Sequence, residues 1–173
     1  EVIGNVENDV PLPHIANIQE TPYVPFRAIK FNLPWDSYRR SDALQLHMET
    51  CRDTLFWEEF LDMMAENRLN ALTLWNLHPF DWMVQLEKYP EASSFTDDRF
   101  KEWRNFWTTL FRMAKNRGID TYIVNWNIFV SDRFAEVHNV AEYSMRNEFY
   151  GASDTSELVK DYYRECVREV INQ

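Results

Sequence analysis

Glycine is scarce in this sequence: the 173 residues include three glycines, Gly4, Gly118 and Gly151. None of them forms a G-x-G-x-x-G stretch or a phosphate-binding loop after a predicted strand, so backbone amides cannot cradle a pyrophosphate in the usual way. A doubly wound nucleotide-binding sheet is therefore disfavoured. Cysteine is scarce too, because Cys51 and Cys166 are too few for a disulfide scaffold and their spacing matches no zinc pattern. The sequence predicts no metal site and no cofactor, and it leaves open whether the two cysteines pair.

Long apolar runs and an excess of basic residues are also missing. No stretch approaches the ~20 apolar residues of a membrane-spanning helix. The formal net charge is −10, from 18 basic and 28 acidic residues. This balance argues against nucleic acid and against an anionic membrane surface as partners, since both require clustered cations. A neutral substrate remains compatible with it, and the residues alone leave the cellular compartment open.

Aromatic residues, in contrast, are abundant, at 16% of the chain with seven Trp, eight Tyr and twelve Phe. Hydrophobic residues make up 45% and charged residues 27%, which is typical of a globular domain with a real core. Most of the aromatic rings are expected in that core. Some are expected to line a ligand cleft, where aromatic faces stack on flat ligands.

Three predicted strands alternate with three predicted helices after an extended lead-in or linker over residues 1–25. This order predicts a parallel sheet with right-handed crossovers, and hence an α/β domain over residues 26–173. The strands are predicted at 26–33, 69–77 and 119–126, and the helices begin at Asp53 or Thr54, at Thr96 and near Asp154.

A (β/α)8 barrel, or TIM barrel, is the architecture that these parallel βα repeats favour. Such a barrel needs eight strands and typically ~250 residues, so the three units would be its first part. The chain ends at Gln173, where a fourth strand would be due. We therefore expect the N-terminal portion of a barrel, incomplete in this chain, or a domain that finds its missing partner elsewhere. Exposed strand faces would make the truncated barrel self-associate.

Amide and indole groups gather at all three predicted strand ends. Because the carboxyl ends of parallel strands meet at one edge of a sheet, these groups predict a pocket rim. Sugars suit such a rim, since amides bond hydroxyls and indoles accept flat C–H faces. For each residue the alternative is a structural cap on a neighbouring loop. The substrate-binding candidates are Asn32, Trp35 and Asp36 at the first strand, Trp75, Asn76 and His78 at the second, and Asn125, Trp126 and Asn127 at the third.

No pair of carboxylates suited to glycoside hydrolysis stands out. That reaction normally needs one carboxylic acid and one carboxylate that acts as base or nucleophile. Asp36 and Asp81 are the acidic residues nearest to the strand ends, and nothing marks either as the acid. No H-x-H motif follows the first predicted strand, which disfavours a metal-dependent hydrolase barrel. The catalytic residues therefore remain unassigned.

Three stretches of the chain resemble the opening of glycoside hydrolase barrels of the α-glucuronidase and β-hexosaminidase type. They are "VPFRAIKFNLPWDSYR", "FWEEFLDMMAENRLNALTLWNLHPF" and "LFRMAKNRGIDTYIVNWNIF", and the resemblance spans residues 24–173. It implies an oligo- or polysaccharide substrate, catalytic carboxylates that lie beyond Gln173, and a periplasmic or secreted protein. It places Arg27 at a sugar-contacting position, with a barrel-base ion pair as the alternative.

The resemblance implies that this fragment alone is inactive and supplies substrate contacts to a glycosidase. The second strand lacks the acidic residues that hexosaminidases have there, which argues against an N-acetylhexosamine substrate. Two other functions stay open. One is a carbohydrate-binding module without chemistry of its own, and the other is a different barrel enzyme, an isomerase or a lyase.

Overall fold

The computed structural model describes residues 19–34, 44–93, 95–125, 128–145, 149–152 and 156–172, and the structural statements below refer to these residues. A three-stranded parallel sheet lies at the centre, in the order β1-β2-β3. Each strand falls within a range predicted from the sequence, and the α/β class and the parallel pairing are confirmed. The strands are β1 (Ala28–Asn32), β2 (Ala71–Asn76) and β3 (Asp120–Asn125).

The three predicted helices are present. They are α3 (Thr54–Glu66), α4 (Asp97–Asn116) and α6 (Glu157–Asn172). Asp53 caps α3 and Thr96 caps α4, because each side chain accepts a hydrogen bond from a backbone N–H of the first turn. At α6 the Ser156 hydroxyl accepts from the N–H of Val159 at 3.4 Å. The expected start at Asp154 lies outside the described residues.

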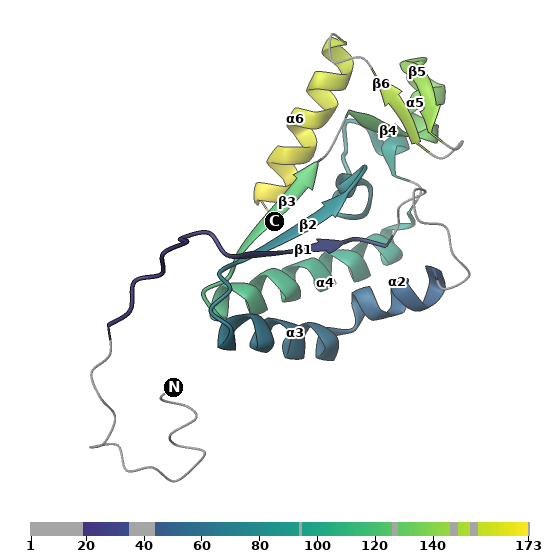
Figure 1. Ribbon diagram of the computed structural model, residues 1–173. Helices are drawn as coiled ribbons and strands as arrows, with labels where there is room; N and C mark the ends of the chain where they lie inside the picture. The colour runs from purple at the N-terminus through teal and green to yellow at the C-terminus, as the bar shows by residue number, and fades with distance from the viewer. Residues whose placement is uncertain are drawn as a thin grey trace.

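The helices bury one face of the sheet. Figure 1 shows α3 and α4 beneath β1 and β2, and α6 running back alongside β3. The apolar stripes read from the sequence supply this layer. Its members include Trp57, Leu61 and Met64 of α3, Trp103, Phe106, Trp107 and Leu110 of α4, and Val159, Tyr162 and Cys166 of α6, packed on Phe31, Leu72, Leu74 and Ile123.

The connections that follow the strands contain secondary structure that the sequence analysis did not anticipate. A second, antiparallel sheet has the order β4-β6-β5 and lies beyond the carboxyl ends of β2 and β3 in Figure 1. No helix in the described part of the chain is long and apolar enough to cross a membrane. The added elements are α2 (Leu44–Arg52), η3 (Pro79–Trp82), η4 (Pro90–Ala92), β4 (Phe129–Ser131), α5 (Asp132–His138), β5 (Ala141–Met145) and β6 (Phe149–Ala152).

Gly118 ends α4 in the left-handed region, with φ at 68°. The N–H of Gly118 bonds to the Lys115 carbonyl at 3.1 Å and that of Ile119 to the Ala114 carbonyl at 3.0 Å, as in a Schellman motif. No atom lies within 4 Å of an added Cβ, so a substitution meets only backbone strain.

Gly118→Ala is therefore expected to lower the free energy of unfolding by about 1 kcal/mol, measured by urea denaturation. Gly118→Asn is the control, because asparagine tolerates the left-handed region and should lose about half as much. Equal losses in the two variants would contradict backbone strain as the cause.

Candidate functional site

The sequence-predicted rim residues divide between the two faces of the sheet. Alternate residues of a strand point to opposite faces. The register sets Asn32 opposite Trp75 across β1 and β2, on the face that no described helix covers, which we call the open face. Asn76 lies one residue further along β2 and points to the helix-covered face, where it is fully buried. The predicted rim residues therefore form two groups on opposite faces of the sheet.

Three side chains on the open face, Lys30, Asn32 and Trp75, form what we call the open-face cluster. Lys30 precedes Asn32 by two residues and points the same way, and its ammonium lies 4.2 Å from the centre of the Trp75 indole. A cation over an indole face is attracted by the ring quadrupole. Trp75 is half-buried and packs beside Leu77 and Phe129. The cluster thus joins an amide, a cation and a flat ring near the carboxyl edge.

Asn76 and His78 form a buried polar link behind the open-face cluster. The Asn76 side-chain N–H donates to the carbonyl of Leu33 at 3.4 Å, and its oxygen accepts from the backbone N–H of His78 at 2.9 Å. Both residues have no exposed surface. Burial lowers the pKa of His78 to about 4, so the imidazole is neutral near pH 7. These two residues tie the end of β2 to the end of β1.

Two consecutive tyrosines of α6 contact these strand ends, and the sequence analysis did not identify them. The Tyr162 hydroxyl lies 3.0 Å from Nε2 of His78. The Tyr163 hydroxyl accepts from the N–H of Phe129 at 3.0 Å and donates to the carbonyl of the same residue. Burial is the largest effect and raises the pKa of Tyr163 above its usual value, although the bonds to Phe129 and to the Asn125 side chain lower it in part. Asn125, at the end of β3, is exposed.

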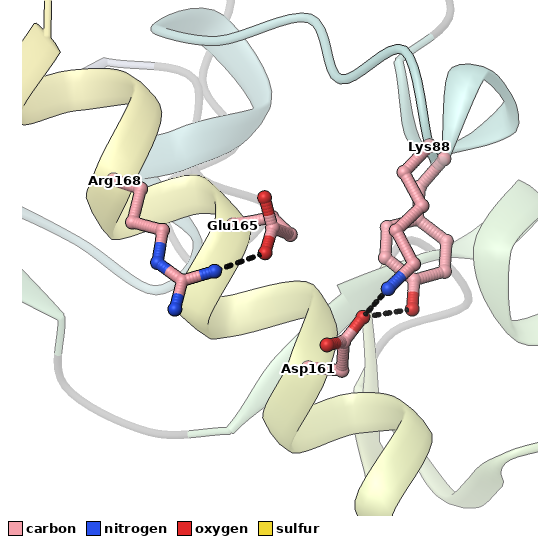
Figure 2. Close-up of polar contacts among 5 residues, drawn as sticks. Lys88, Asp161, Glu165 and Arg168 are labelled. Atoms are coloured by element: carbon pink, nitrogen blue, oxygen red, sulfur yellow. Dashed lines mark hydrogen bonds and ion pairs between the residues drawn. The ribbon is translucent and has the colours of Figure 1, made fainter.

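Helix α6 is also joined to the connection that follows β2. The Tyr89 hydroxyl donates to Asp161 at 2.6 Å. Figure 2 shows Asp161 bonded to Lys88, and Arg168 bonded to Glu165. Burial, and then the bond to Asp161, raise the pKa of Tyr89 to about 12. The Lys88 ion pair is solvent-exposed and contributes little stability by itself. The buried Tyr89 ring therefore stabilises the position of α6 more than the ion pair does.

Arg27 lies at the amino end of β1, at the opposite end of the sheet from the rim. Its guanidinium donates to the carbonyls of Arg68 at 2.6 Å, Val24 at 2.7 Å and Pro25 at 3.2 Å. A five-residue strand is about 15 Å long, so Arg27 and the open-face cluster occupy different regions. The four other sequence-predicted site residues, Trp35, Asp36, Trp126 and Asn127, lie outside the described residues.

Asp81, in η3 directly after β2, carries a buried carboxyl oxygen. Its Oδ1 has no hydrogen-bond partner among the described residues. Burial, together with the nearby Asp132 of α5, raises its pKa to about 7. An ionised carboxylate there is costly, because a buried charge without a donor loses its hydration and gains no bond in return. Among the residues that the structure describes, no three His, Cys, Asp or Glu side chains gather as a metal centre would require.

No protein-family model matches the chain, and no curated protein matches it. A solved structure that it resembles is a GH138 enzyme targeting pectin rhamnogalacturonan II, with 26% sequence identity and a TM-score of 0.77. The similarity covers 99% of this chain and 20% of that chain, so the chain spans about one fifth of its structural neighbour. The fold and the sequence together are similar to part of a glycoside hydrolase.

Asn76→Ala is expected to lower the free energy of unfolding by about 1–3 kcal/mol, because it leaves a buried carbonyl of Leu33 and a buried N–H of His78 without their partner. Thermal and urea denaturation measure the loss. Asn67→Ala is the matched control, since its exposed amide also bonds one carbonyl, at 2.8 Å, and should lose about 0.5 kcal/mol. Similar losses in the two variants would mean that the Asn76 link is not structural.

Asp81→Asn is expected to change how stability depends on pH. The raised pKa of Asp81, about 7 against 3.8, lowers the free energy of unfolding as pH rises between these values. The lowered pKa of His78, about 4 against 6.5, does the reverse over nearly the same interval. The titrations of Asp81 and His78 therefore change the stability in opposite directions, and Asp81→Asn removes only the effect of Asp81.

The advantage of Asp81→Asn over the wild type should therefore grow between about pH 4 and about pH 7 and level off above that, by on the order of 2–4 kcal/mol in urea denaturation. Glu87→Gln, at an exposed position, is the control and should show no such growth. An advantage that is constant with pH would show that folding does not raise the pKa of Asp81.

Proposed function

We propose that this chain contributes the first βα units of a glycoside hydrolase barrel, and that its open face forms part of the wall of a saccharide-binding site. The similarity to a GH138 enzyme over 99% of the chain supports the reaction class. The α/β order and the parallel sheet support the barrel units, since ligand sites of barrels lie at the carboxyl ends of the strands.

The observation that carries the proposal is the open-face cluster. Asn32 and Trp75 are in register on neighbouring strands, and Lys30 lies over the indole. A sugar ring requires a flat apolar platform and paired donors and acceptors for its hydroxyls, and these side chains provide both. The half-buried indole has its ring held by packing, so little conformational entropy is lost when a ligand stacks on it.

The substrate class we propose is a plant cell-wall oligo- or polysaccharide, with pectic side chains as the first candidates. The structural neighbour targets rhamnogalacturonan II, and a related barrel opening favours a related class of polymer. Asp81 is assigned no catalytic role, because its buried oxygen lies behind the end of β2, near Tyr162 and Cys166. The catalytic carboxylates are proposed to come from residues outside this sequence.

The test is the affinity of the protein for rhamnogalacturonan II oligosaccharides, measured by titration calorimetry. Trp75→Ala should weaken binding about tenfold, since loss of one aromatic platform is worth about 1.4 kcal/mol. Trp75→Phe, which keeps a flat ring, should restore most of the affinity. Tyr23→Ala is the control, because Tyr23 is a fully exposed aromatic residue that lies before β1, outside the sheet.

Hydrolysis is measured on the protein in the form in which its source makes it, by release of reducing ends. Binding together with hydrolysis supports the proposal. Binding without turnover would favour a carbohydrate-binding module. An affinity that Trp75→Ala leaves unchanged would remove the open face from the site, whatever the activity.

A further inference from the structure

Helix α6 sends two neighbouring side chains to two different strand ends. Tyr162 and Tyr163 are consecutive, and their rings lie 5.5 Å apart at an interplanar angle of 80°. The first contacts the end of β2 and the second contacts the residue that opens β4, after β3. A helix residue and its neighbour point about 100° apart, so only a helix that crosses near both strand ends can make both contacts.

The path from Tyr162 leads through buried polar groups to the residue beside Trp75. The Tyr162 hydroxyl bonds to Nε2 of His78, the backbone N–H of His78 bonds to Asn76, and Asn76 bonds to the Leu33 carbonyl. Tyr162, His78 and Asn76 are each at most 2% exposed. Asn76 follows Trp75 directly in β2. Holding the Asn76 side chain on the helix-covered face therefore fixes the direction in which the Trp75 side chain projects from the open face.

The path from Tyr163 is shorter. Its hydroxyl both accepts from and donates to the backbone of Phe129, which is fully buried and packs with Leu77 beside Trp75. Two bonds to one residue fix the backbone of that residue in place as well as in orientation. Tyr163 therefore holds a residue against which the same indole packs.

We propose that Tyr162 and Tyr163 are positioning residues for saccharide binding, which hold Trp75 in its binding orientation from behind the sheet without touching the ligand. This proposal rests on the proposed function, because it requires the open face to bind a sugar. A purely structural role for the tyrosines would affect stability alone. A positioning role must also affect the affinity through Trp75.

The experiment compares Tyr162→Phe and Tyr163→Phe with the wild type by titration calorimetry against rhamnogalacturonan II oligosaccharides. Each variant removes one oxygen atom and keeps the ring, so the core packing is preserved. Tyr162→Phe loses its bond to His78 and Tyr163→Phe loses both bonds to Phe129, and each variant should weaken binding about fivefold. Tyr23→Phe is the matched control, because it loses the same atom at a fully exposed position, and its affinity should stay within about twofold of the wild type.

Two further measurements separate positioning from folding. Combining either tyrosine variant with Trp75→Ala should give no additional loss of affinity, because the tyrosines act through the indole. In nitrogen NMR the signals of the His78 imidazole and of the Trp75 backbone amide should shift in Tyr162→Phe and stay in place in Tyr23→Phe. The imidazole signal reports the lost bond directly.

The outcomes distinguish this inference from the proposed function. Unchanged affinity in both tyrosine variants overturns the positioning role, even if their melting temperatures fall. Additive losses with Trp75→Ala overturn it as well. If the wild type binds no saccharide, the proposed function fails. The NMR comparison then decides whether Tyr162 holds Trp75 in place. A Trp75 amide that shifts in Tyr162→Phe then supports the mechanical link, and one that does not shift overturns it.

Discussion

A parallel sheet is stable when both of its faces are covered, and this constraint governs the molecule. In the described part of the chain α3, α4 and α6 cover one face with the aromatic side chains of the core. The other face carries Lys30, Asn32, Thr73 and Tyr122 where a doubly covered sheet would carry Val, Ile and Leu. Polar groups there suit a face that encloses a ligand site. The same constraint underlies the proposal that the chain self-associates.

The elements that sequence reasoning located correctly are those set by local physics. The stripe of α4 repeats at helical spacing, Thr96 and Gly118 mark its ends, and the strands are short apolar runs between such marks. The elements it missed depend on tertiary pairing. Strand β4 is three residues long and acquires its identity only by pairing with β6, so no periodicity within it could reveal it.

The candidate site was predictable in composition but not in geometry. Asn32, Trp75 and Asn76 were each identified at strand ends, yet their division between two faces follows from the register, which no single strand contains. Arg27 shows a different limit, because its neighbours in the sequence give no indication that its guanidinium bonds to carbonyl groups at the amino end of the sheet. Tyr162 and Tyr163 occupy an ordinary helical pattern, and only the crossing of α6 over the strand ends gives them a role.

Buried polar groups are costly, and their concentration behind β2 therefore needs a physical reason. An apolar residue in place of Asn76 would itself need no hydrogen bond, but it would leave the carbonyl of Leu33 and the N–H of His78 without partners and the end of β2 without a directional contact. Hydrogen bonds fix orientation, whereas apolar packing tolerates rotation and shift. A pocket wall whose indole must meet a sugar at a defined angle gains from that fixed orientation. In the proposed site, the polar link holds the end of β2 from the helix-covered face, and the open-face cluster meets the ligand on the opposite face.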